Sequence, residues 1–339
     1  MKKSPLIELR TSPHVLGTLS LPQIMRQVVY ALLPICGFAI YQFGLSALAL
    51  ILVVIISCLL TEHGFNRLAG RKNTLLDASA LITGILLALT LPPSFPLWMG
   101  AVAGFIAISM GKVLFGGLGF NSFNPALMGR AFVQAAFPVA ITSWTPAFMA
   151  ERFTQFIPST MSIPFTIPIS SDAISQATPL ALQKFEASTT PLYDLFLGYS
   201  SGSLGETSAL LIFLCGAYLV IRGFMGWRIP VAILTSTIVL SSLFSLFGIG
   251  PGALFMLSSG GLMLAALFMA TDPVSAPVTP LGMWLFGFLI AFITIIIRLF
   301  AGLPEGIMYA ILLANASVPL IEAICQPRKF GKLPKAGLK

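Results

Sequence analysis

A loop segment places a threonine hydroxyl directly before a proline. The stretch Asp172-Ala-Ile-Ser175-Gln-Ala177-Thr178-Pro179 also puts small side chains just ahead of that threonine. A residue that precedes proline favours an extended backbone. Because the neighbouring side chains are small, we expect the Thr178 hydroxyl to be accessible. A modifying enzyme that attaches a group to a side-chain oxygen needs such an acceptor. On the local pattern alone, a simple loop turn rich in serine and threonine is the more common explanation.

A glycine-rich stretch precedes a clear helix start. Asn124 followed by Pro125 predicts a helix with asparagine as its N-cap and proline at its first position. Gly117 and Gly119 allow unusual backbone dihedrals or a close approach to a ligand, and Asn121 lies between them and the cap. A helix N-terminus beside glycines suits an anion or the polar edge of a cofactor. This stretch is therefore a candidate cofactor site.

Charged and hydroxyl side chains also interrupt the apolar runs. Arg130 lies about two turns into the same helix, and an arginine in a membrane span is costly and usually has a partner or a function. An ion pair that merely holds two helices together is an equal alternative. Asp272 lies at a break between spans, where it would cap a half-helix or bind a cation. Asp77 is expected to cap the helix on which Ser79 and Thr83 share one face.

The composition restricts the class of protein that holds these residues. The chain has 339 residues, of which 57% are hydrophobic and only 9% are charged. A soluble domain carries about 25% charged residues. Soluble, fibrous, disordered and disulfide-stapled proteins are therefore excluded, and an integral membrane protein remains. The four cysteines are scattered singly, so we expect no metal site and no iron–sulfur cluster.

An all-α fold follows, because a helix that crosses the hydrocarbon needs roughly 20 mostly apolar residues. Such runs predict about ten transmembrane helices. The third and eighth are short and end in proline-rich breaks, and the fifth contains Pro138. The predicted spans are 27–44, 45–61, 77–92, 96–115, 124–144, 206–222, 229–247, 252–271, 280–300 and 304–324.

The basic residues predict the orientation of these spans. With the N-terminus in the cytoplasm, most of the 19 lysines and arginines fall on the cytoplasmic side, and only Arg152 and Lys184 fall in the long outside loop. This asymmetry is the positive-inside pattern, and it explains the net charge of +8 without a nucleic acid partner. We expect both termini in the cytoplasm, the long loop in the periplasm and the bacterial inner membrane as the location.

The spans divide equally around the long loop, with an odd number in each half, so the halves would run in opposite directions. Inverted repeats with broken helices at their interface are a known membrane architecture. A weak sequence similarity between the third and eighth predicted spans favours an inverted repeat, although apolar helices resemble one another in any case. The predicted segments are an N-terminal segment 1–26, a first repeat 27–144, a periplasmic loop 145–205, a second repeat 206–324 and a basic tail 325–339.

The loop stretch resembles the D-x-x-S-G-A-T motif of membrane flavoproteins, in which the threonine carries FMN through a phosphoester bond. Gln176 stands at the motif's glycine. The G-G-L-G-x-N-x-F-N-P stretch and the D-P-V-S-A-P stretch that starts at Asp272 occur in the family's order. Over nearly its whole length the chain resembles the NqrB/RnfD family, the membrane subunits of ion-translocating flavoprotein complexes. The long extension that NqrB members usually carry before the first span is not seen, so the resemblance is greater to the RnfD branch.

The resemblance implies a redox role. Thr178 would carry FMN as a phosphorylated threonine, with Asp172, Ser175 and Ala177 as the attachment motif that a flavin transferase recognises. The chain would pass electrons within an Rnf-type electron transport complex and couple them to Na⁺ or H⁺ translocation. It would act as one subunit of that translocase and not be catalytic alone. Its partners would include iron–sulfur subunits and a second subunit with covalent flavin.

A second flavin, riboflavin held without a covalent bond, is also implied by the resemblance. Its candidate site, or a coupling site for the ion, comprises Gly117, Gly119, Asn121, Asn124, Arg130 and Asp272. Two alternatives remain open. One is an NqrB-type subunit of an NADH:quinone reductase, and the other is a flavin-free transporter or channel with the same inverted repeat.

Overall fold

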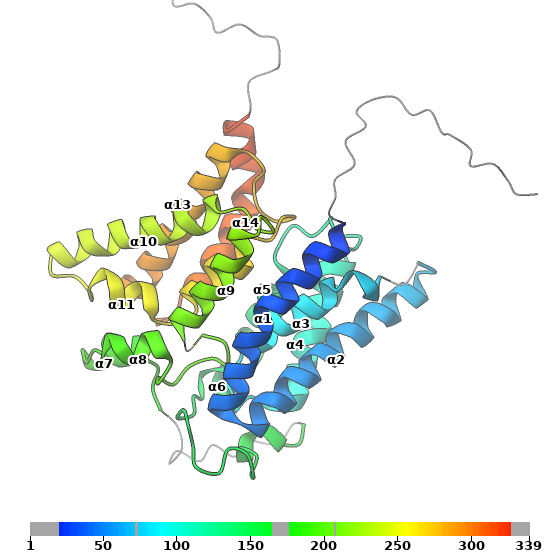
Figure 1. Ribbon diagram of the computed structural model, residues 1–339, viewed down its shortest axis with the longest axis horizontal. Helices are drawn as coiled ribbons and strands as arrows, with labels where there is room; N and C mark the ends of the chain where they lie inside the picture. The colour runs from blue at the N-terminus through cyan, green and yellow to red at the C-terminus, as the bar shows by residue number, and fades with distance from the viewer. Residues whose placement is uncertain (1–19, 72–73, 165–175, 207, 327–339) are drawn as a thin grey trace, which may run out of the picture.

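The computed structural model describes residues 20–71, 74–164, 176–206 and 208–326. All regular structure within these ranges is helical (Figure 1), which confirms the predicted all-α class. Five helices are long and apolar enough to cross a membrane, as expected of an integral membrane protein. They are α1 (Leu21–Phe43), α2 (Leu45–Leu68), α10 (Arg228–Leu246), α13 (Pro280–Phe300) and α14 (Ile307–Ile324).

The other predicted spans form shorter or divided helices, so the number of membrane crossings stays a prediction. Pro138 has no N–H with which to continue α5, and Gly260, at φ +63°, separates α11 from α12. These elements are α3 (Ser79–Leu89), α4 (Leu97–Ile108) with the π-helical turn η2 (Ser109–Val113), α5 (Pro125–Ala136), α6 (Pro138–Thr142), α9 (Ala209–Ile221), α11 (Ala253–Ser258), and α12 (Leu262–Leu264) with the π-helical turn η5 (Ala265–Met269).

The long loop holds short helices of its own. Figure 1 places α7 and α8 toward the opposite end of the bundle from the start of α1 and the end of α14. This placement agrees with termini on one side of a membrane and the loop on the other, and the orientation itself stays a prediction. The remaining short elements are η1 (Leu75–Asp77), η3 (Pro158–Met161), α7 (Pro179–Glu186) and α8 (Leu192–Leu197).

The helices have the same order of neighbours in both halves of the chain. α2 packs against α3 and α4, and α10 packs against α11 and α13. α4 then contacts α5, as α13 contacts α14. The halves meet where α1 lies against α9 and where α5 lies against α14. Two inverted repeats would produce this order, which supports the predicted repeat without establishing it.

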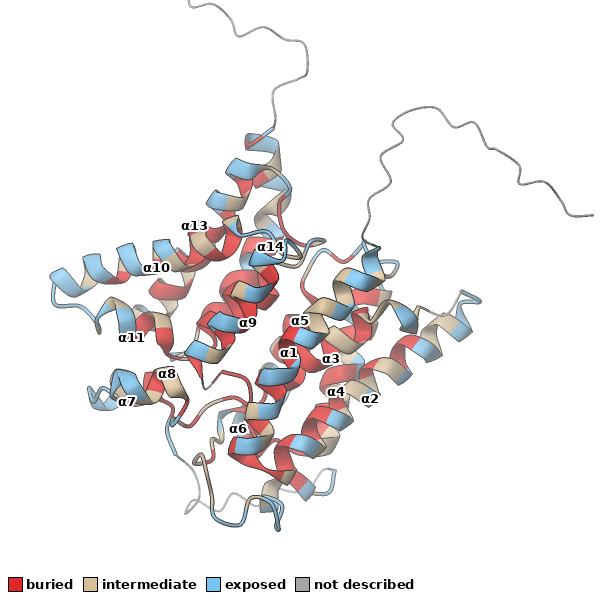
Figure 2. Cartoon of the chain, viewed as in Figure 1, coloured by how far each residue is buried: buried red, intermediate tan, exposed pale blue. Residues whose placement is uncertain are grey.

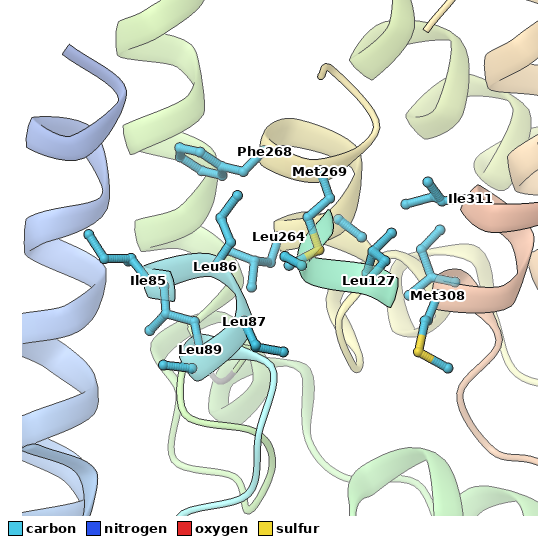
Figure 3. Close-up of a cluster of buried hydrophobic side chains, with 14 of the residues drawn as sticks. Ile85, Leu86, Leu87, Leu89, Leu127, Leu264, Phe268, Met269, Met308 and Ile311 are labelled. Carbon is cyan, nitrogen blue, oxygen red and sulfur yellow. The ribbon is translucent and has the colours of Figure 1, made fainter. Parts of the chain in front are cut away.

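The core lies where the broken helices of the two halves meet. Figure 3 shows Leu86 and Leu87 of α3, Leu127 of α5 and Met308 of α14 converging on one cluster. Figure 2 shows buried residues toward the centre of the bundle and many exposed residues on its outer faces. Those outer faces carry large apolar side chains, which a hydrocarbon environment tolerates and water does not. On α2 they include Leu52, Ile56 and Leu60.

Candidate functional site

Thr178 begins α7 with the backbone conformation that its proline predicts. The residue is extended, at φ −71° and ψ 156°, and Pro179 occupies the first helical position. The Thr178 Oγ1 accepts a hydrogen bond from the backbone N–H of Ala181 at 3.3 Å, so the threonine also caps the helix. Ala177 lies just before it, and its carbonyl accepts from the Ser201 hydroxyl at 2.9 Å. Asp172 and Ser175 lie outside the described residues.

The accessibility expected at Thr178 is wrong. The residue is only 4% exposed, because α7 folds back onto the second half of the chain. Leu180, on the first turn of α7, packs with Leu195 of α8 and Phe255 of α11. A small cavity with room for about one water molecule adjoins Thr178. Local sequence predicts a backbone conformation but not this tertiary packing.

Arg130 has two carboxylate partners, which bear out the expectation that a buried arginine is paired. Its Nη1 donates to Glu206 Oε1 at 2.8 Å, and its Nη2 donates to Glu305 Oε2 at 2.7 Å. Ser203 donates to the other Glu206 oxygen at 2.6 Å. Arg130 belongs to α5, whereas Glu206 precedes α9 and Glu305 precedes α14, so this cluster joins the two halves. Glu206 and Glu305 also line the small cavity beside Thr178.

A second buried arginine lies close to this cluster. Arg298 of α13 donates through Nη1 to the carbonyl of Met256 at 2.5 Å and through Nη2 to the carbonyl of Ser259 at 3.0 Å. Those carbonyls have no partner within the helix because α11 ends there. The guanidinium therefore supplies the hydrogen bonds that they lack at the break in the eighth predicted span. Arg298 and Arg130 supply two guanidinium groups, and Glu206 and Glu305 supply two carboxylates, so the charges in this region balance. Such balance is the condition under which charges persist in a buried site.

Glu206, Glu305 and Arg298 are site residues that the sequence patterns do not single out. The sequence feature that could have identified the acidic residues is their small number, since the whole chain has only 11 of them. An acidic side chain at the end of an apolar run is then a candidate partner for a buried arginine. Which one pairs with which depends on the fold, because the partners of Arg130 are distant in the sequence.

A larger cavity of about 330 Å³ lies toward the other end of the bundle. Three of the residues predicted for the second site line it, namely Asn121, Asn124 and Asp272. Asn121 Nδ2 donates to Asp272 Oδ2 at 3.1 Å, and the Ser275 hydroxyl donates to the same oxygen at 2.9 Å. These bonds hold the glycine-rich stretch against the loop that follows η5. The structure therefore brings two distant predicted stretches together.

Asn124 is the expected N-cap and does more than cap. Its Oδ1 accepts from the N–H groups of Ala126 and Leu127 at 3.0 and 3.3 Å. Its Nδ2 donates to the carbonyl of Met269 at 3.0 Å, at the end of η5. The start of α5 is thus tied to the second half of the chain.

The remaining predicted residues of the second site are not in the larger cavity wall. Gly117 and Gly119 have φ of +108° and +92°, which confirms the unusual dihedrals expected of them, but neither lines the cavity. Arg130 is in the cluster near Thr178 instead. Of the six candidates, three line the larger cavity, Arg130 belongs to the cluster near Thr178, and the two glycines are in neither place.

One residue of the cavity wall, Lys112, belongs to a buried ion pair that sequence reasoning missed. Lys112, in η2, donates to Glu62 Oε1 at 2.7 Å and to the Ser79 hydroxyl at 2.6 Å. Asp77 accepts from both the N–H and the hydroxyl of Ser79, at 2.9 and 2.6 Å. The N-cap of α3 is Ala78, however, so the prediction that Asp77 caps this helix is wrong by one residue. The positive-inside pattern counts Lys112 among the basic residues that face the cytoplasm. Its burial shows that it is paired inside the bundle instead.

The cavity wall is mostly apolar with a few polar groups, and its volume is within the range of small-molecule sites. The two π-helical turns, η2 and η5, both contribute residues to it, and such turns recur at functional sites. Val28, Leu86 and Phe268 supply apolar surface, whereas Thr83 and Asn121 supply polar atoms. Such a wall can hold a small, mostly apolar molecule whose polar groups meet these side chains.

Comparison with known proteins places the chain in a family. A model of the NQR2, RnfD, RnfE family matches residues 8–331. The chain is 37% identical to the RnfD-type subunit of the proton-translocating ferredoxin:NAD(+) oxidoreductase complex of Clostridium ljungdahlii, over 97% of each chain. It is 41% identical to the corresponding subunit of the Na(+)-translocating ferredoxin:NAD(+) oxidoreductase complex of Acetobacterium woodii, over 95% of this chain and 94% of the relative.

A third relative is the corresponding subunit of the ion-translocating oxidoreductase complex of Halorhodospira halophila, which is 37% identical over 96% of each chain. These matches cover the broken helices, the cluster around Arg130 and the larger cavity. The chain therefore belongs to the NQR2, RnfD, RnfE family.

Proposed function

We propose that this chain is the RnfD-type membrane subunit of an Rnf ion-translocating oxidoreductase complex. In that role it passes electrons through FMN bound covalently to Thr178. The observation that supports the proposal best is the place of Thr178 at the start of α7, beside the buried cluster of Arg130, Glu206 and Glu305 that joins the two halves. A redox group held there would lie next to the charges that connect the halves.

Thr178 Oγ1 would supply the oxygen of the phosphoester, and the bound FMN would supply one- and two-electron chemistry. Because Thr178 is buried when α7 is packed, a flavin transferase must reach it before Leu180 docks against Leu195 and Phe255. The cap contact with the Ala181 N–H then fixes the direction in which the oxygen points. Near this end of α7, Arg130 and Arg298 supply guanidinium groups whose charge Glu206 and Glu305 balance.

The larger cavity is the proposed site of a second flavin. Its charged lining residues in the described part of the chain are Lys112 and Asp272, and Lys112 is already paired with Glu62. A phosphate group would meet no free cation there. A flavin without phosphate, such as riboflavin, suits this wall better than FMN does.

The coupling ion is Na⁺ or H⁺ in this proposal. The two relatives from Clostridium ljungdahlii and Acetobacterium woodii carry different ions in their names, so the family resemblance does not select one. Asp272 is the proposed coupling group, because it is a partly buried carboxylate whose contact with Asn121 joins the two halves.

The proposed setting is the bacterial inner membrane, with both termini in the cytoplasm and the long loop in the periplasm. The other subunits of the complex, which would hold the iron–sulfur clusters and a second covalent flavin, are the proposed partners, together with a flavin transferase during maturation. An NqrB-type role would keep the same flavin chemistry and change only the complex.

Flavin fluorescence after denaturing electrophoresis tests the proposal. The chain from cells with an active flavin transferase should give a fluorescent band, and Thr178→Val should abolish it. Thr189→Val, an exposed threonine of the same loop, is the matched control and should leave the band unchanged. A dark wild-type band would favour the flavin-free transporter.

A further inference from the structure

The connection between α13 and α14 surrounds a single ammonium group with backbone carbonyls. Lys184 Nζ donates to the carbonyls of Arg298 at 2.8 Å, Leu303 at 3.1 Å and Ile297 at 3.4 Å, and also to that of Ala301. An ammonium has three N–H donors, so four oxygens exceed what directed hydrogen bonds require. Four neutral oxygens within reach of one positive charge are also what an alkali cation requires. We call these four carbonyls the carbonyl cage.

The cage exists because a helix ends there. The last carbonyls of α13 have no partner within the helix, and the negative end of the helix dipole lies at the same place. The backbone N–H of Ala301 satisfies Ile297 in part, at 3.0 Å, and the connection then curves so that Leu303 also points inward. Rings of backbone carbonyls replace the water shell of alkali cations in other proteins.

The charge of the cage selects the type of ion. No ion pair with Lys184 forms among the residues that the structure describes. Burial lowers the pKa of the Lys184 ammonium, and the groups that face it are neutral carbonyls. Sites for divalent ions usually add carboxylates. A site made only of neutral oxygens therefore suits a monovalent cation.

The lysine reaches the cage from a helix that is attached at few points. Lys184 is on the last turn of α7, and the next residue, Phe185, is 68% exposed. At the start of α7, Leu180 packs against α8 and α11. The Lys184 contact therefore holds the end of α7, whereas Leu180 holds its beginning.

We propose that the carbonyl cage is a binding site for a monovalent cation such as Na⁺ or K⁺, and that Lys184 is a tethered occupant which the ion displaces. Displacement would free the end of α7 and leave its start in place. Ion binding and the position of α7 would then be linked, each affecting the other. Only the consequence for a flavin on Thr178 rests on the proposed function, and the cation site itself does not.

Removal of the lysine tests the site. The full chain in detergent is heated in NaCl, KCl or N-methylglucamine chloride at equal ionic strength. Wild-type protein should unfold only slightly higher in NaCl or KCl than in N-methylglucamine chloride, because the ion must first displace Lys184. Lys184→Met should unfold about 2 °C or more higher in NaCl or KCl than in N-methylglucamine chloride, because the small ion fills the cage. ²²Na⁺ should likewise bind to Lys184→Met more tightly than to the wild type, in which it must compete with Lys184.

Arg152→Met is the matched control. Arg152 is the other cation of the long loop and also donates to backbone carbonyls, those of Tyr41 and Met149. Its loss should lower the unfolding temperature equally in all three salts. If Lys184→Met does not accumulate, Lys184→Gln replaces it, since the amide retains donors for the carbonyls. Loss of stability that is equal in all salts, without ²²Na⁺ binding, would overturn the proposal and leave Lys184 as a helix anchor.

Discussion

Arg130 of α5 and Glu305 at the start of α14 form an ion pair of 2.7 Å that joins the two halves of the chain. Glu206 binds the other arm of the same guanidinium at 2.8 Å. The cluster explains how a charged residue persists in a span, and it gives the halves a fixed point of contact beside α7.

Arg130→Met should strongly destabilise the protein, because it leaves Glu206 and Glu305 buried without a counter-charge. Breaking such a pair costs about 3–5 kcal/mol. Thermal unfolding of the full chain in detergent measures the loss. Arg222→Met, which removes an exposed arginine, should change stability by about 0.5 kcal/mol or less. Equal stability of the two variants would show that the cluster does not hold the halves together.

Thr83→Trp should exclude the second flavin. Thr83 lines the larger cavity, and an indole there would occupy the space that an isoalloxazine ring needs. Acid extraction followed by chromatography should then recover no riboflavin, while the covalent flavin remains on the chain. Leu52→Trp, on the outer face of α2, should leave both flavins in place. Undiminished riboflavin in Thr83→Trp would place that cofactor elsewhere.

Asp272→Asn should leave flavin attached but reduce ion transport. Asparagine keeps the size and one acceptor oxygen, so the contacts with Asn121 and Ser275 can persist while the charge is lost. Transport into sealed vesicles and fluorescence of the denatured chain provide the two readings. Ser275→Ala, which removes only a hydrogen bond, should transport nearly normally. Full transport by Asp272→Asn would reduce the residue to a local helix cap.

The elements are largely predictable because their signals are local. Apolar runs locate the helices, Asn124-Pro125 locates the start of α5, and Pro179 sets the extended backbone of Thr178. The glycine dihedrals at Gly117 and Gly119 follow from residue type alone. In each case a neighbouring residue or the residue type itself fixes the conformation.

The site is only partly predictable, because its contacts join distant segments. The partners of Arg130 and of Lys112 lie far from them in the chain, and no periodicity connects them. The burial of Thr178 follows from the docking of α7 on the second half, which no local pattern contains. A rare charge in an apolar chain predicts that a partner exists but does not identify it.

The mass of the tryptic peptide that ends at Lys184 tests the central claim most directly. Trypsin cleaves after Arg152 and Lys184, so this fragment contains Thr178. In protein from cells with a working flavin transferase, the peptide should be heavier by one FMN phosphoester, and fragmentation should locate the added mass on Thr178. An unmodified peptide from such cells would contradict the account of this chain as an electron carrier.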